Sequence, residues 1–218
     1  MPANPGRQSR RKYMENLHFV NSRPSAKFAG QGGERTWLVL IGRADSLLLV
    51  VDLQDRLVPA MEPDRPFVAA TVKLVEAANL LKLPVLASEQ YPKGLGRTVP
   101  EVAALVPEAQ RYEKMEFSCN ANTGIRRALA GVNRSQVVLA GIEAHVCVMQ
   151  TALELAASGS AVFVVTDATA SRRPASRETA FRRMADAGVA LVTLEMVLFE
   201  WLRSAADPEF RAVSKLIR

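Results

Sequence analysis

From residue 46 onward, short apolar runs alternate with longer stretches in which apolar and polar residues are mixed. Each apolar run ends at a polar or turn-forming residue, which is the pattern of a strand buried on both faces of a sheet. The pattern predicts strands over 46–52 (SLLLVVD), 83–88 (LPVLAS), 135–142 (SQVVLAGI), 161–168 (AVFVVTDA) and 189–195 (VALVTLE). The segment 110–114 (QRYEK) adds a short sixth strand.

The stretches between the predicted strands carry the spacing of amphipathic helices. Pro66 suits the first turn of one helix. The apolar stripe of that helix consists of Phe67, Leu74, Ala78 and Leu81. Segment 91–100 (YPKGLGRTVP) holds too many Gly and Pro residues for a regular element and is predicted to be a surface loop. Further helices are predicted over 121–131, 145–159, 176–188, 195–205 and 207–218.

Strands and helices that alternate in this way predict a three-layer α/β/α, Rossmann-like fold with a six-stranded parallel sheet. Residues 45–218 are expected to form one domain, since the sequence shows no internal repeat. Ligands of such sheets bind at the carboxyl ends of the strands, near a topological switch point. Asp52, Lys114 and the turn 141–147 each follow a predicted strand. We therefore expect all three at the same edge of the sheet.

Charge changes the picture at the N-terminus. The net charge is +6, and residues 1–44 account for it with eight basic and two acidic side chains, while the rest of the chain has 20 of each sign. The folded body therefore gives no indication of nucleic-acid binding. Residues 1–44 lack a regular apolar period and are predicted to be a basic, disordered extension. A flexible tail, a mis-called upstream start codon and a weak organelle-targeting peptide are three explanations of this extension.

The sequence also bears on the compartment. No apolar stretch approaches the ~20 residues that span a membrane, and no apolar core of a secretory signal is present. Two cysteines, Cys119 and Cys147, do not make a disulfide framework and favour a reducing compartment. We predict a cytoplasmic protein without a membrane partner, with organelle import through the Arg-rich N-terminus as the alternative.

Cys147 has two interpretations. Free cysteine is often a small apolar residue of the core. Cys147, however, falls in the first turn of a predicted helix, where unpaired N–H groups and the helix dipole lower the pKa of a thiol. The entry GIEAHV contains no Ser, Thr, Asp or Asn cap, so its N–H donors are left for an external oxyanion. A nucleophilic thiol is therefore a hypothesis beside the core interpretation.

A nucleophilic thiol needs a group that accepts its proton. The chain has two histidines, and His18 lies in the N-terminal extension. His145 is two residues from Cys147, a spacing at which helical side chains do not face each other. The base is therefore expected to be a carboxylate, and Asp52, which follows an apolar strand, is the best candidate.

Two further polar residues follow predicted strands. Asp167 has the same profile as Asp52, and we interpret it as a structural residue that bonds a loop. A lone lysine is usually a solvated surface charge. At the expected edge of the sheet, Lys114 would instead stabilise both Asp52 and a thiolate of Cys147.

Three motifs in this order resemble the isochorismatase-like cysteine hydrolases, a superfamily that includes nicotinamidases and N-carbamoyl amide hydrolases. They are LLLVVDLQDRL (47–57), KMEFSCN (114–120) and VVLAGIEAHVCVMQTALELAASG (137–159). The resemblance covers most of the folded body, from about Leu47 to the last helix.

The resemblance implies a mechanism. Asp52 is the general base and acid, Lys114 stabilises charge, and Cys147 attacks a carbonyl carbon to form a thioester. The backbone N–H groups of Glu143 and Cys147 form the oxyanion hole, and the peptide that matches Ile142–Glu143 is cis. An amine or ammonia leaves, and water hydrolyses the thioester. Superfamily members that cleave isochorismate lack the cysteine, so its presence favours the hydrolysis of C–N bonds other than peptide bonds.

The sequence departs from nicotinamidases at their metal site. That site follows the second strand with a D-x-H-P-like run and uses a further histidine. Here Glu89 takes the place of the aspartate and Tyr91 that of the histidine, and many members have a threonine where Ala144 stands. Without imidazole ligands, we expect neither a metal nor any other cofactor. SEQYPKGLG and FSC instead resemble the branch of isochorismatase-domain hydrolases.

The substrate is expected to be a small molecule. Leu57, Glu89, Gln90 and Phe117 are predicted to line its pocket, with Cys119 packed in the pocket wall. The resemblance implies a homo-oligomer, and the apolar segment 196–202 (MVLFEWL) suits a subunit contact.

Two other functions stay open. One is a catalytically silent binding protein of the same fold. The other is a redox-sensing protein in which Cys147 is oxidised to a sulfenic acid.

Overall fold

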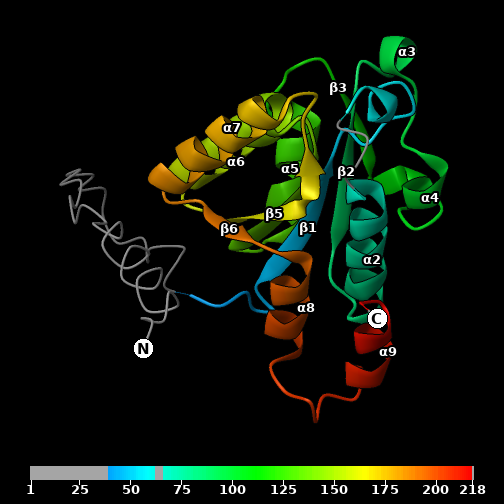
Figure 1. Cartoon of the computed structure of the whole chain (residues 1–218), viewed down its shortest axis with the longest axis vertical. Helices are drawn as coiled ribbons and strands as arrows, with labels where there is room; N and C mark the ends of the chain where they lie inside the picture. Colours follow the sequence, from blue (N-terminus) through cyan, green and yellow to red (C-terminus); the bar gives the residue numbers. More distant parts are fainter. Residues whose placement is uncertain (1–38, 62–65, 218) are drawn as a thin grey trace, which may run out of the picture. The chain divides into compact units, whose positions relative to one another are not determined.

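The computed structural model describes residues 39–61 and 66–217. Six strands form one parallel sheet with the spatial order β3-β2-β1-β4-β5-β6, which confirms the predicted fold class (Figure 1). The order reverses between β1 and β4, so the topological switch point lies between these two strands. The strands are β1 (Ser46–Val51), β2 (Val85–Gln90), β3 (Arg111–Lys114), β4 (Gln136–Ile142), β5 (Ala161–Ala170) and β6 (Ala190–Val192).

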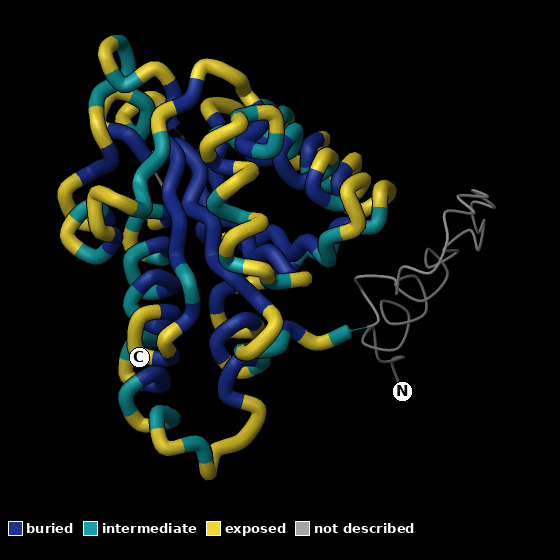
Figure 2. Tube along the Cα trace, turned by 180° about the vertical axis from the view of Figure 1, so that it is seen from behind, coloured by how far each residue is buried: buried dark blue, intermediate teal, exposed yellow. Residues whose placement is uncertain are grey.

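The predicted apolar runs form the central strands of the sheet. Helices cover both faces of the sheet, so the strands are largely buried (Figure 2). In β1, Leu48 and Val50 face one core, while Leu47, Leu49 and Val51 face the other. The first core packs against α2 (Phe67–Leu80), α4 (Pro100–Ala103), α8 (Leu194–Leu202) and α9 (Phe210–Lys215). The second packs against α5 (Thr123–Val132), α6 (Met149–Ala157) and α7 (Pro174–Asp186). The sheet and its two helical layers make the three layers predicted.

Several predicted boundaries need correction: the strand predicted over 83–88, for example, is β2 over 85–90, and three further changes alter the kind of element. The last strand ends at Val192, because Thr193 caps α8 by accepting a hydrogen bond from the Met196 N–H (3.3 Å). Segment 91–100 is not wholly irregular, since it contains α3 (Pro92–Leu95) and the first residue of α4. The helix predicted over 145–159 is divided into a π-helical turn, η5 (Ala144–Val148), and α6. The 3₁₀ turns η3 (Val58–Ala60) and η4 (Glu108–Gln110) complete the described elements.

Most of the predicted extension, residues 1–38, lies outside the described residues. Its last residues belong to the folded body. Ile41 is fully buried, and its N–H donates to the Glu200 carboxylate (2.6 Å). The Gly42 N–H donates to the Gln136 side chain (2.6 Å). Among the described residues, no helix is long and apolar enough to cross a membrane.

Gly141 allows β4 to approach β1 closely at the switch point. Val51 lies between Ser88 of β2 and Gly141 of β4 in the sheet. Gly141 has a φ of +120°, and a Cβ atom at this position would overlap the backbone carbonyl of Val51. Glycine is therefore required here, because it combines this φ with the space that the neighbouring strand needs. The ends of β1 and β4 are thereby held side by side.

Candidate active site

The carboxyl edge of the sheet brings together the three residues that the sequence singled out. Asp52 follows β1 directly, and the turn that carries Cys147 follows β4, the neighbouring strand at the switch point. Lys114 is the last residue of β3 and reaches past β2 to Asp52. Asp52 adopts a left-handed backbone conformation with a φ of +50°, which is uncommon outside glycine.

Asp52 and Lys114 form a fully buried ion pair. Lys114 Nζ donates to Asp52 Oδ2 at 2.7 Å, and both side chains have 0% exposure. The ammonium also lies 2.7 Å from Gln90 Oε1 and 3.2 Å from the carbonyl oxygens of Glu116 and Phe117. Burial acts to lower the pKa of Lys114, but the charge of Asp52, the two cysteines Cys119 and Cys147 and the hydrogen bond to Asp52 together outweigh it, and the pKa is raised. Lys114 is therefore held as a cation.

Two side chains of β2 complete the surroundings of this pair. Ser88 Oγ donates to Asp52 Oδ1 at 2.8 Å, and Gln90 accepts from Lys114. Residues two apart on a strand face the same side. Ser88 was not among the predicted site residues, and Gln90 was predicted to line the substrate pocket. Residues 88–90 (Ser-Glu-Gln) stand directly before the loop at this edge, and in a strand the first and third of them face the same side. This alternation is the signal that would have found both Ser88 and Gln90.

Cys147 lies in the π-helical turn η5 and is 6% exposed. Burial and then the charge of Asp52 raise the pKa of its thiol, while the Lys114 ammonium acts in the opposite direction. The predicted lowering of this pKa by the helix start is therefore wrong: desolvation and a nearby carboxylate exceed it. The resting thiol keeps its proton, so a reaction at Cys147 needs a base.

The turn between β4 and Cys147 has a distinctive backbone. The Ile142–Glu143 peptide is cis, as the resemblance implied. The N–H groups of Val146 and Val148 donate to the Glu143 carbonyl oxygen at 3.1 and 3.2 Å. The Glu143 carboxylate in turn accepts from the backbone N–H and the Nε of Arg172, at 3.2 and 2.9 Å. The segment after β5 is thereby tied to the turn after β4.

The second cysteine, Cys119, is buried in the same network. Its thiol donates to Ser88 Oγ at 3.4 Å, and its backbone N–H donates to Thr151 Oγ1 at 2.9 Å. Burial, followed by the charge of Asp52, raises the pKa of Cys119 to about 11. The Cys119 side chain is 0% exposed and packs in the second core, which agrees with the packed role predicted for it.

The other predicted pocket residues occupy different environments. Glu89 points away from the ion pair, and its carboxylate accepts from the Thr98 N–H (2.9 Å) and from Arg97 Nη1 (2.8 Å). Leu57 is half-buried and packs against the first core. Phe117 is 54% exposed, although its carbonyl oxygen contacts Lys114. Their contribution to a substrate pocket stays a prediction.

His145 and Asp167 have structural partners. His145 Nδ1 lies 3.0 Å from Ser171 Oγ. Asp167 accepts a hydrogen bond from the Leu194 N–H at 2.8 Å, at the start of α8, which supports the structural interpretation. Within residues 39–61 and 66–217, no group of three or more His, Cys, Asp or Glu side chains is arranged to hold a metal ion.

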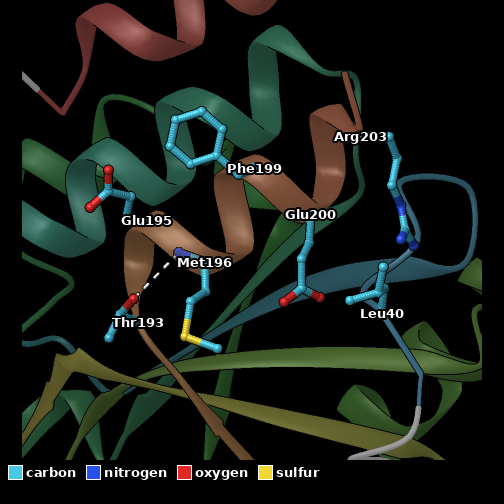
Figure 3. A pocket seen from close by; sticks show the side chains of 7 residues that line it. All are labelled: Leu40, Thr193, Glu195, Met196, Phe199, Glu200 and Arg203. Carbon is cyan, nitrogen blue, oxygen red and sulfur yellow. Dashed lines mark hydrogen bonds between the residues drawn. The ribbon is translucent and has the colours of Figure 1, made fainter. Parts of the chain in front are cut away.

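Neither of two surface hollows is lined by Asp52, Lys114 or Cys147. One has a volume of about 500 Å³ and opens along α8 (Figure 3). It is lined by Leu40, Thr193, Glu195, Met196, Phe199, Glu200 and Arg203. The other, of about 410 Å³, lies between the turn η5 with α6 and the helix α7. Its lining residues are His145, Met149, Ala175, Ser176, Thr179, Ala180 and Arg183.

The structure is a doubly wound parallel sheet that carries a carboxylate, an ammonium and a thiol at its carboxyl edge, where α/β proteins of this class bind their ligands. The isochorismatase domain family matches residues 46–196, so the chain belongs to the isochorismatase family of hydrolases.

Relatives of known sequence or structure agree with this assignment. Isochorismatase domain-containing protein 2 of Xenopus laevis is 36% identical over 178 residues, which are 81% of this chain and 85% of the relative. The MAR1 ribonuclease of Caenorhabditis elegans superposes with a TM-score of 0.77 at 36% identity and covers 82% of this chain and 92% of its own. The YcaC gene product of Escherichia coli, an octameric hydrolase of unknown specificity, has a TM-score of 0.78 at 29% identity and covers 82% and 89%.

Proposed function

We propose that this protein is a metal-independent cysteine hydrolase that cleaves an amide or related C–N bond of a small molecule. The observation that carries the proposal is the buried Asp52–Lys114 ion pair, which acts electrostatically on the Cys147 thiol. Because the thiol is protonated at rest, it needs the adjacent carboxylate to become nucleophilic. Perturbed titratable groups at the carboxyl edge of a doubly wound sheet are typical of a catalytic site.

The reaction proceeds in two halves. Asp52 takes the proton of Cys147 while the sulfur attacks the carbonyl carbon, and the resulting oxyanion accepts hydrogen bonds from the N–H groups of Glu143 and Cys147. Asp52 then gives the proton to the departing nitrogen as the C–N bond breaks, which leaves a thioester. Asp52 next takes a proton from water, and the hydroxide attacks the thioester carbonyl. The carboxylic acid forms as the sulfur leaves and takes that proton back from Asp52. Lys114 holds its positive charge beside the carboxylate and the thiolate throughout.

The charge of the folded body favours a small substrate over nucleic acid. One similar structure is the MAR1 ribonuclease. In this chain, residues 45–218 carry equal numbers of basic and acidic side chains. Nucleic-acid binding depends largely on the neutralisation of phosphates by Lys and Arg, and the folded body has no excess of either.

The ion pair and the thiol also argue against the two alternatives. A buried ion pair is weak support for stability, so a silent binding protein gains little from keeping one. A redox sensor needs only a reactive thiol, so it leaves the buried Asp52–Lys114 pair beside Cys147 without a function.

The test is the hydrolysis of a panel of small amides, with ammonia release and intact mass as readouts. We expect one amide to release ammonia and to leave an acyl group on Cys147, and both signals to vanish in Cys147→Ala. Cys119→Ala, which removes the other buried thiol, should keep the acyl adduct. Ammonia release that survives in Cys147→Ala would overturn the assignment of the nucleophile.

We further infer that several copies assemble, with the hollow along α8 as a contact. The Escherichia coli relative is octameric. Met196 and Phe199 line this hollow and are 46% and 42% exposed (Figure 3). Phe199→Glu is expected to lower the mass measured by light scattering, whereas Leu80→Glu, at another exposed apolar position (40%), should not. An unchanged mass for Phe199→Glu would exclude this contact.

A further inference from the structure

The Lys114 ammonium has more neighbours than its ion-pair partner. Four oxygen atoms lie within 3.2 Å of Nζ, and the two closest, at 2.7 Å, belong to Asp52 and Gln90. An ammonium has three N–H groups, so its direction depends on which acceptors hold it most closely. Asp52 fixes one N–H, and Gln90 fixes a second from the side of β2.

The orientation of the Gln90 amide is determined by its two neighbours. Its Nε2 donates to the Met115 carbonyl oxygen at 2.8 Å, and its Oε1 therefore faces Lys114. The flipped amide would place an NH₂ group against the ammonium and a carbonyl oxygen against a carbonyl oxygen, which is repulsive at both ends. Gln90 is thus a fixed acceptor and not an adaptable one.

A second buried glutamine fixes the backbone of Gln90. Gln54 has 0% exposure and lies two residues after Asp52. Its Oε1 accepts from the Gln90 N–H at 2.7 Å, and its Nε2 donates to the Gln90 carbonyl oxygen at 3.0 Å. Nε2 also donates to the Gly96 carbonyl oxygen at 2.7 Å. One side chain thereby joins the segment after β1, the end of β2 and the loop that follows it.

Ser88 and Gln90 each offer the hydrogen-bonding group that suits the charge they contact. Ser88 gives a donor to the carboxylate of Asp52, while Gln90 gives an acceptor to the ammonium of Lys114. We propose that Gln90, held by Gln54, is a positioning residue that keeps the Lys114 ammonium directed at Asp52 and beside Cys147. This inference rests on the proposed function for the role of Lys114, and it adds a residue that touches neither the thiol nor the reacting carbonyl.

The experiment uses acrylamide as a probe of the thiolate, because a related YcaC of Pseudomonas aeruginosa has been crystallised with covalent acrylamide. The thiolate sulfur adds to the terminal alkene carbon, and the neighbouring carbon takes a proton from solvent. The rate of adduct formation on Cys147 is measured against pH by intact mass, with peptide mapping to separate Cys147 from Cys119. Cys147→Ala provides the blank.

Gln90→Leu removes the acceptor and should shift the alkylation profile to higher pH. Without that acceptor the charged form of Lys114 loses a hydrogen bond, and the ammonium is held less firmly beside Cys147. The thiolate of Cys147 is then less stabilised by the positive charge. The groups that act electrostatically on Lys114, namely Asp52, Cys119 and Cys147, are all retained. We expect alkylation at neutral pH to slow about tenfold, which corresponds to a shift of one pH unit in the thiolate fraction. Gln54→Leu should shift the profile in the same direction by less.

Gln136→Leu is the matched control. Gln136 is 8% exposed, as Gln90 is, and its side chain likewise uses both amide atoms, in this case with the Gly42 N–H and the Leu40 carbonyl (3.1 Å). It lies at the opposite end of the sheet, so its loss should lower Tm and leave the alkylation profile unchanged. If Gln90→Leu fails to fold, Gln90→Met, which keeps the length without the amide, takes its place.

Two results would overturn the positioning role: a Gln90 variant whose profile coincides with that of the unchanged protein, or a Gln136 variant that shifts equally. The outcome is separable from the proposed function. A protein that shows the expected shifts but hydrolyses no amide retains the role of Gln90 and loses the proposed reaction.

Discussion

The two ends of the central strands are equally buried but chemically different. At the amino end of β1, Ser46 accepts from Trp201 Nε1 at 2.9 Å and donates to the Gly42 carbonyl at 2.7 Å. Gln136, at the amino end of β4, also binds backbone groups of residues 40–42. These contacts are between neutral groups, and the Glu200 carboxylate described nearby accepts from the Ile41 N–H and is not part of a buried ion pair among the described residues. They close the sheet at this end and hold the incoming chain in place.

The carboxyl end holds opposite charges in the same degree of burial. Asp52 and Lys114 are both removed from water, and only hydrogen-bonding neighbours such as Ser88 and Gln90 offset the cost. Neutral hydrogen bonds would close this end of the sheet as well as they close the other. The buried ion pair therefore lowers the stability of the fold at the carboxyl end, where the proposed reaction takes place. Four substitutions test this difference between the two ends.

The largest effect is expected from Lys114→Met. It leaves the Asp52 carboxylate buried without a partner, which should destabilise the fold by about 3–5 kcal/mol in urea unfolding and abolish amide hydrolysis. The double variant Asp52→Asn/Lys114→Met should regain most of that stability and none of the activity. A single variant as stable as the unchanged protein would contradict the view that this end is costly.

Gly141→Ala should be the next most damaging change. Its Cβ atom would overlap the Val51 carbonyl and the residue would have to keep a positive φ, so we expect a loss of about 2–3 kcal/mol with impaired activity. Gly131→Ala in α5 meets no atom within 4 Å and should instead stabilise by about 0.5–1 kcal/mol. Equal urea midpoints for the two variants would refute the requirement for glycine at the switch point.

Trp201→Phe tests the neutral end. It removes the indole donor to Ser46 and keeps most of the apolar ring, so we expect a loss of about 1 kcal/mol, seen as a lower Tm. Ammonia release and acrylamide labelling of Cys147 should be unaffected. A change in either readout would show that the two ends of β1 are coupled. It would contradict the view that the amino end contributes only to stability.

Glu89→Gln should have the smallest effect, a modest loss of stability at neutral pH that fades at low pH. Burial acts to raise the pKa of Glu89, but hydrogen bonds from Thr98 and Arg97 outweigh it, so the pKa is lowered from its usual value of 4.5. The resulting stabilisation is present above pH 4.5 and is lost as the pH falls through the lowered pKa. As the pH is lowered below 4.5, the Tm should therefore fall less steeply for Glu89→Gln than for the unchanged protein. Parallel curves would show that this carboxylate has no lowered pKa.

The sequence predicted the strands and the meeting of Asp52, Lys114 and Cys147, because parallel strands end at a common edge. It did not predict the direction of the pKa shift of Cys147, because that depends on burial and on the position of Asp52, which are tertiary properties. Ser88 was missed since its motif carries no charge or metal ligand. The early end of the last strand depends on one cap at Thr193, a local contact that an apolar pattern does not reveal.

The alternation along the end of β2 has a consequence for insertions and deletions. Ser88 and Gln90 face the ion pair, while Glu89 faces Thr98 and Arg97 on the other side. A slip of one residue in the pairing of β2 with β1 would turn each side chain to the opposite face. Glu89 would then bring a second carboxylate against Asp52, and Arg97 would lose its partner. The length of the connection between α2 and β2 is therefore expected to tolerate changes only where they are absorbed before Val85, ahead of the first paired residue.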